Sequence, residues 1–350
     1  MTDLSTTYLG LRLRNPLVAS SSPATQGVDR VRALAEAGVG AVVLPSLFEE
    51  QVVREQLHDL ALTEAHEDAF GEAMSYLPTA PSTATGGATR HLRLVEQCAA
   101  AVDVPVIASL NGSTSGGWAR FAHSLADAGA AAIELNVYVV PGDPTTSGRD
   151  VEDLHVEALE QVKAVVSVPV AVKLSPYFSA TGEMAARLDR AGADGLVLFN
   201  RFLQPDVDTD TLRVTTGIEL SSPAEARLAR TWVAILHHRV RASLAATTGV
   251  EDSGDLAAYL LAGADVVMTA SALLRHGIGH TGALLEGLTA WMHRHGFTGL
   301  DEFRGRLAVP SDVDSTAHER AGYVAALEKA RRTYGDLAVT RRAQPSSSST

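Results

Sequence analysis

The chain has very little cysteine. Its 350 residues contain one, Cys98, which excludes an internal disulfide framework and a metal site built from several cysteines. Cys98 lies in the stretch LRLVEQCAAAV, an expected helix, where a thiol most simply serves as a small buried hydrophobe. No metal site is expected, and an iron–sulfur cluster would have to lie on a separate chain.

Positive charge and long apolar runs are also scarce. Lys and Arg number 29 against 41 Asp and Glu, a formal charge of −12, so nucleic acid is not expected as a partner. No uncharged run is long enough to span a bilayer, since LAAYLLAGADVVMTASALL is interrupted by Asp265. The first residues lack a secretory signal pattern, and we therefore expect a cytoplasmic protein.

Short apolar runs alternate with longer amphipathic segments over most of the chain. This alternation predicts strands followed by helices, and continuous Val-rich runs are typical of buried parallel strands. Glycines before every second strand fit helix ends in the left-handed conformation; they are Gly38, Gly129, Gly192 and Gly263. Eight strands are expected, at 16–21, 40–45, 104–110, 131–136, 168–174, 195–200, 242–247 and 265–270.

Eight such units predict an α/β protein with a (β/α)8 TIM-barrel fold. An open, doubly wound sheet is the rival, and it is disfavoured because no G-x-G-x-x-G follows an early strand. We assign the barrel to residues 1–300, a helical extension to 301–339 and a disordered, Ser-rich tail to 340–350.

Two segments are longer than ordinary loops. One spans 47–89 after the second strand, and the other spans 203–222 after the sixth. Both follow strands, so both would lie over the carboxyl ends of the barrel, where barrel enzymes have their sites. They are candidate lids, with surface decoration as an equal alternative, and the alternating sequence of the second predicts a small hairpin.

Polar side chains stand where the strands end. They include three amides, Asn111, Asn136 and Asn200, and one lysine, Lys173. No carboxylate lies within three positions of Lys173, which favours a ligand as its partner, although a carboxylate distant in the sequence stays open. One such Asn would most simply be a structural amide. Three amides with a lysine instead favour binding of a heteroaromatic ring.

Taken together, these stretches resemble the dihydroorotate dehydrogenase family of FMN-dependent barrels, and most closely its dihydroorotate dehydrogenase-like branch. The resemblance implies an oxidoreductase of pyrimidine metabolism, in which a hydride moves between a small cyclic substrate and the flavin. The stretches that carry it are NPLVAS, LPSLFEEQ, VIASLNG, ELNVY, VPVAVKLSPYF, GLVLFN and VVMTASALLRHG.

The resemblance also implies roles for individual residues. Lys173 would stabilise negative charge on the reduced ring. Proton transfer is not assigned by the resemblance; we expect it from Tyr138, the nearest ionisable side chain, or from a residue of a lid. Asn111, Asn136 and Asn200 would bind the substrate. The residues expected at the cofactor are Ala19, Ser20, Ser46, Ser109, Asn136 and Lys173 at the flavin, and Thr248, Gly249, Ala270 and Ser271 at its phosphate.

The chain departs from the family pattern where the proton acceptor belongs. The family has Asn-x-Ser-[Cys or Ser]-Pro-Asn there, and the fourth position in this chain is Val139, which cannot accept a proton. Pro45 replaces a family lysine, and Thr248 and Ala270 replace glycines of the phosphate loops. We therefore expect poor oxidation of dihydroorotate and action on another small cyclic or unsaturated compound.

Two other functions stay open from the sequence. A barrel that has lost catalysis could serve as a ligand-binding or assembly subunit, as a homodimer or beside a separate electron-transfer chain. An aldolase-type enzyme would instead use Lys173 as a Schiff-base nucleophile, which the amide-rich strand ends disfavour.

Overall fold

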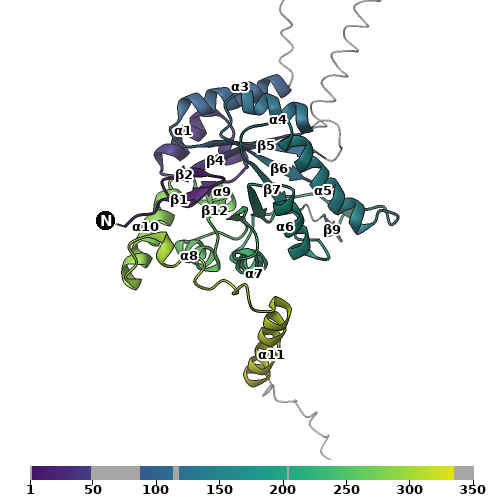
Figure 1. Cartoon of the computed structure of the whole chain (residues 1–350), viewed down its shortest axis with the longest axis vertical. Coiled ribbons are helices and arrows are strands. Elements are labelled where there is room, and N and C mark those ends of the chain that lie inside the picture. Colours follow the sequence, from purple (N-terminus) through teal and green to yellow (C-terminus); the bar gives the residue numbers. More distant parts are fainter. Residues whose placement is uncertain (1, 49–86, 113–117, 203–204, 335–350) are drawn as a thin grey trace, which may run out of the picture. The chain divides into compact units, whose positions relative to one another are not determined.

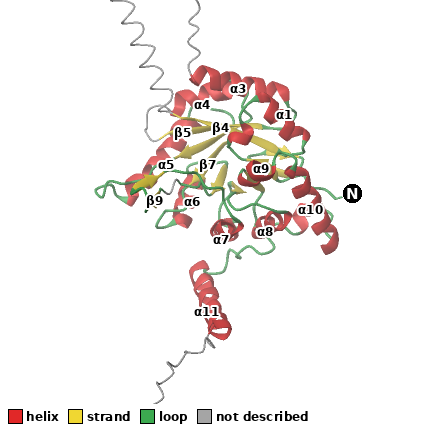
Figure 2. Ribbon diagram, turned by 180° about the vertical axis from the view of Figure 1, so that it is seen from behind, coloured by secondary structure: helices red, strands yellow, loops and turns green. Residues whose placement is uncertain are grey.

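The computed structural model describes residues 2–48, 87–112, 118–202 and 205–334. Eight parallel strands close into a barrel, with helices around its outside (Figures 1 and 2). The closed sheet confirms the TIM barrel and excludes the open, doubly wound alternative. All eight predicted strands are confirmed: β3 (Leu17–Ala19), β4 (Ala41–Phe48), β5 (Val106–Gly112), β6 (Ala132–Val137), β7 (Val170–Leu174), β8 (Gly195–Leu198), β11 (Ser243–Ala246) and β12 (Val266–Thr269).

Helices connect these strands. The four predicted glycines have left-handed φ angles of 106°, 95°, 93° and 116°, which confirms their role at helix ends. The helices of the barrel are α1 (Val28–Glu36), α3 (Gly87–Ala101), α4 (Trp118–Asp127), α5 (Gly148–Lys163), α6 (Thr181–Arg190), α7 (Ala226–Leu236), α8 (Ser253–Ala262), α9 (Ser271–His276) and α10 (His280–His295), with short 3-10 turns η1 (Pro23–Thr25), η2 (Pro223–Glu225) and η3 (Leu300–Glu302).

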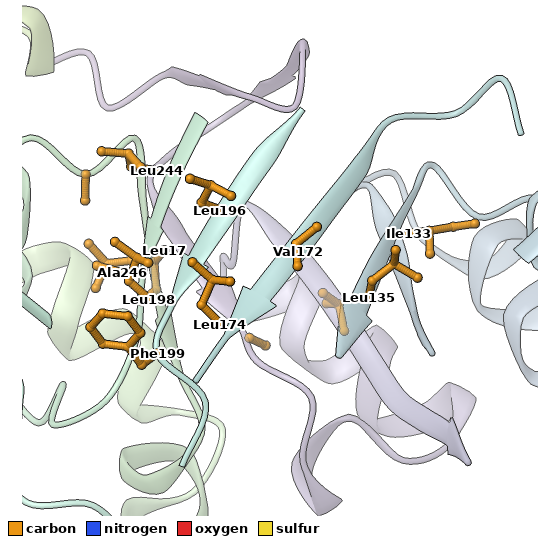
Figure 3. Packing of buried hydrophobic residues seen from close by; sticks show 14 of the residues in the cluster. Leu17, Ile133, Leu135, Val172, Leu174, Leu196, Leu198, Phe199, Leu244 and Ala246 are labelled. Atoms are coloured by element: carbon orange, nitrogen blue, oxygen red, sulfur yellow. The ribbon is translucent and has the colours of Figure 1, made fainter. Parts of the chain in front are cut away.

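Side chains alternate between the two faces of the barrel wall, as they must on a strand. One set packs against the helices in the main core cluster, and Figure 3 shows its members on neighbouring strands. Burying such a Leu or Ile contributes roughly 1.5–3 kcal/mol each. The other set fills the barrel interior and includes Val43, Ile107, Ala132, Ala171, Val197, Ala245 and Met268.

A small hairpin that the sequence did not predict closes one end of the interior. It consists of β1 (Thr6–Tyr8) and β2 (Leu11–Leu13), which pair antiparallel. The side chain of Leu9, in the turn of this hairpin, packs against Gly195, the first residue of β8. A side chain at position 195 would clash, because its Cβ would lie 2.5 Å from Cδ2 of Leu9. The hairpin therefore fills the amino ends of the strands, and a ligand site must open at the carboxyl ends.

The predicted hairpin after the sixth barrel strand is confirmed. It pairs β9 (Asp206–Asp208) with β10 (Arg213–Thr215) in antiparallel register. Most of the other candidate lid, residues 49–86, lies outside the described residues. The prediction for Cys98 is also confirmed, since its thiol is buried and free.

The chain divides into two compact units, Met1–Ala308 and Val309–Thr350. The first holds the barrel, and the second holds α11 (Ser315–Tyr334). The predicted tail at 340–350 lies outside the described residues. Of the helices in the described ranges, none combines the length and the apolarity that a bilayer crossing requires.

Candidate active site

A cavity of 1940 Å³ lies at the carboxyl ends of the strands. It is large enough for a ligand of the size that enzyme pockets hold. The residues predicted for the site stand at the ends of all eight barrel strands, and those at the ends of five neighbouring strands, β4 to β8, share this cavity. Six of them line the cavity: Ser46, Asn111, Asn136, Tyr138, Lys173 and Asn200.

Three of these residues form a row across neighbouring strands. Asn111 on β5 is the register partner of Asn136 on β6, and Asn136 is the partner of Lys173 on β7. All three are at most 8% exposed. The amide of Asn200, just after β8, donates from Nδ2 to Oδ1 of Asn136 over 2.8 Å. The row presents amide donors and acceptors beside one ammonium group, as a heterocyclic ligand requires.

The partner of Lys173 is Glu134, which the sequence analysis missed. The Nζ atom of Lys173 lies 3.4 Å from Oε1 of Glu134, and the glutamate is 1% exposed. The open alternative of a carboxylate distant in the sequence is thus confirmed. Because strand residues two apart share a face, the sequence could have placed Glu134 on the same face as Asn136. The other carboxylate oxygen, Oε2, has no hydrogen-bond partner among the described residues.

The remaining residues predicted at the flavin ring lie deeper. Ser109 is fully buried, and its Oγ lies 2.8 Å from Oγ of Ser46, so Ser46 stands between it and the cavity. Ser20 is 3% exposed, and its N–H donates to the carbonyl of Thr269. The side chain of Ala19 belongs to the core cluster on the helix side of the wall, so only its backbone can meet a ligand in the barrel.

Two of the four residues predicted for a phosphate, Gly249 and Ser271, contact Ser221, a residue that the sequence analysis missed. Gly249 has a φ of 68° and donates its N–H to Oγ of Ser221 over 3.2 Å. Ser271, at the start of α9, accepts from the N–H of Ser221 over 3.0 Å and lies 2.9 Å from its hydroxyl. Ala270 directly precedes this helix. Thr248 has a φ of 81° and lines a second cavity of 380 Å³ instead of the large one.

The segment after β6 has no acid or base at the position of Val139. That side chain is half-buried and packs against the core cluster. Among the ionisable groups that line the cavity are Tyr138, which precedes Val139 in the chain, and His91. Burial lowers the pKa of His91, on α3, to about 4, so its imidazole is neutral near neutral pH. No pattern in the sequence distinguishes His91 from the other histidines of the chain.

The fold and the site define a TIM-barrel protein with a large cavity lined by amides and a lysine at the carboxyl ends of its strands. A family model described as dihydroorotate dehydrogenase matches residues 80–292, and the chain belongs to that family. The predicted resemblance is thereby confirmed.

Individual relatives agree with this family. Over 320 residues the chain is 26% identical to a dihydroorotate dehydrogenase B (NAD(+)) catalytic subunit from Methanothermobacter thermautotrophicus, with 86% of this chain and 97% of the relative covered. A putative dihydroorotate dehydrogenase A (fumarate) from Aeropyrum pernix is 26% identical over 309 residues, with 87% and 97% covered. A B-type catalytic subunit from Halalkalibacterium halodurans is 34% identical over 178 residues, with 49% and 58% covered.

FMN is the cofactor that the family implies, and the residues in the cavity wall have the chemistry that its ring would need. At the ring end, the buried ammonium of Lys173 faces the cavity beside the amides. At the phosphate end, Gly249 leaves no room for a side chain, since a Cβ would lie 2.5 Å from the carbonyl oxygen of Ser222. None of the residues predicted at the phosphate lines the large cavity, and the N–H of Gly249 already donates to Oγ of Ser221.

Proposed function

We propose that the chain is an FMN-dependent oxidoreductase, which exchanges a hydride with a small cyclic substrate other than dihydroorotate. The observation that carries the proposal is the buried row of Asn111, Asn136 and Lys173 in the cavity wall, with Glu134 behind the lysine. When bound, FMN supplies the hydride chemistry, and the protein supplies binding, orientation and charge.

Each residue of the row has a distinct task. The ammonium of Lys173 stabilises negative charge on a ring beside it. Glu134 holds that ammonium in place and balances its charge inside the barrel, where an unpaired ion would be costly. The amides of Asn136 and Asn200 bind the polar edge of a ring. The salt bridge to Glu134 engages Nζ of Lys173, which argues against its use as the Schiff-base nucleophile of the aldolase alternative.

Proton transfer separates this chain from the pattern of its family. Val139 cannot accept a proton, so another group must do so, and Tyr138, its neighbour in the chain, lines the cavity. Loss of a positioned base lowers rates by about 10²- to 10⁴-fold. Oxygen-free mixing of flavin-loaded protein with dihydroorotate is therefore expected to bleach the visible flavin band slowly. Fast bleaching would overturn the proposed substrate difference.

A second candidate is a ligand-binding or assembly subunit without catalysis. One observation at the residues predicted to bind the phosphate favours this candidate. The N–H groups of Gly249 and Ser221 already donate hydrogen bonds within the chain, so they are not free for a phosphate. Such a subunit would retain no reducible flavin. The name of the relatives as catalytic subunits supports instead an enzyme that works beside a separate electron-transfer chain.

A further inference from the structure

Aromatic residues follow three neighbouring barrel strands. Tyr138 follows β6, Tyr177 follows β7, and Phe202 follows β8. The ring centroids of Tyr138 and Phe202 are 4.3 Å apart with planes inclined by 35°. Those of Tyr177 and Phe202 are 5.8 Å apart at 62°. The three rings form a continuous aromatic wall, in which Phe202 is the central member.

The aromatic wall borders the same space as the amide row. Tyr138 and Phe202 line the large cavity together with Asn136 and Asn200. Phe202 and Asn200 also line the second cavity, with Tyr177. An apolar ring face and a hydrogen-bonding amide therefore stand next to each other at the end of β8. This combination matches a ligand with a flat apolar face and a polar edge.

We propose that the aromatic wall selects substrates with a planar, conjugated ring. The ring face packs on Phe202 and Tyr138, and its polar edge binds the amides of Asn136 and Asn200. The inference rests on the proposed function and narrows its substrate to a chemical class. Aromatic rings attract one another beyond the area that they bury, by about two- to tenfold in affinity. A saturated, puckered ring gains none of this.

The alternative is that the three rings only pack the segment after β8 onto the barrel. Packing alone would bury them, yet Tyr177 is 63% exposed. The wall also lies beside Val139, where the family pattern has polar residues that act on the substrate. An aromatic surface in that place changes which compounds fit there, and not only how the loop is held.

The test uses flavin-loaded, full-length protein and two probes of equal skeleton, 2-naphthol and its fully saturated counterpart decahydro-2-naphthol. Calorimetric titration is expected to show tighter binding of the planar probe, by about two- to tenfold. Phe202→Leu should abolish that preference. Val207→Ala is the matched control, because Val207 lies in β9, five residues after Phe202, is 64% exposed and does not line either cavity.

Equal affinity for the two probes, binding of neither, or a preference that survives Phe202→Leu would each overturn the inference. If Phe202→Leu does not fold, the same two probes are titrated into Tyr138→Leu and into the unchanged protein. The inference then requires that the unchanged protein prefers the planar probe and that Tyr138→Leu reduces this preference. The visible spectrum is recorded first. A protein without flavin counts against the proposed function, and the probe preference of the flavin-free protein still tests the aromatic wall separately.

Discussion

The ammonium of Lys173 lies 3.4 Å from the carboxylate of Glu134 inside the barrel, and both side chains are almost completely buried. Two charges in such a place are stable only as a pair. The pair lies directly under the cavity, so Lys173 presents a fixed positive charge to whatever ring binds there. The second oxygen of Glu134 finds no hydrogen-bond partner among the described residues.

Breaking this pair should be costly. Glu134→Gln leaves a buried ammonium without its counter-charge, and we expect the free energy of unfolding to fall by about 3–5 kcal/mol. Urea denaturation measures the change. Glu160→Gln on the exposed side of α5 is the control and should shift stability by less than about 0.5 kcal/mol. A Glu134→Gln protein as stable as its parent would show that the two side chains do not depend on each other.

Restoring a proton acceptor should restore the family reaction. Val139→Cys places a thiol of similar volume where the family has Cys or Ser, and we expect dihydroorotate oxidation to rise by at least about tenfold. The rate is read from bleaching of the flavin band. Val140→Cys adds the same group one residue further on, at a side chain that is 63% exposed, and should leave the rate unchanged. Equal rates in all three proteins would mean that Val139 does not limit the reaction.

Gly249 should contribute both to the stability of the fold and to binding of the FMN phosphate. Its φ of 68° costs a residue with a side chain about 1–2 kcal/mol, and a Cβ would also press on the carbonyl of Ser222. Gly249→Ala should therefore lower the melting temperature and weaken FMN binding. Gly10→Ala separates the two effects, because Gly10 has a similar φ of 73° and open space around its Cβ position. If both variants behave alike, the close approach at Gly249 has no role.

The protein should lose stability in mild acid through His155. Burial lowers the pKa of this histidine below its usual 6.5, so its ring stays neutral in the fold. Below about pH 6.5 the unfolded chain takes up a proton that the folded chain does not, and stability falls as the pH drops. Unfolding by urea at about pH 7.5 and about pH 5.5 should show a smaller loss for His155→Leu than for the parent protein. His123→Leu, at a side chain that is 61% exposed, should retain the full loss.

The barrel could be predicted because its signals are local. Each buried parallel strand is a short Val-rich run, and glycines such as Gly129 mark the helix ends before them. The strands β1 and β2 have three residues each, which is too short for an alternation of apolar and polar residues to identify them. The position of their hairpin depends on its contact with Gly195, which is distant in the sequence.

The site could be predicted only in part, for the same reason. Amides and a lysine at strand ends stand out against apolar runs, so Asn136 and Lys173 were found. Glu134 sits inside an apolar strand, and its pairing with Lys173 spans 39 residues. Ser221 lies on a loop and reaches Gly249 and Ser271 only after folding. Contacts of this kind depend on the closed barrel and leave no pattern in the sequence.

The visible absorption spectrum of the purified protein, before and after addition of FMN, tests the central claim most directly. A ring bound beside Lys173 and a phosphate bound at Gly249 and Ser271 predict a flavin band that remains with the protein through gel filtration. Lys173→Met should perturb that band, and Arg241→Met, at an 84% exposed side chain outside the cavity, should not. Protein that stays colourless even after incubation with FMN would contradict the account and leave the ligand-binding subunit as the better description.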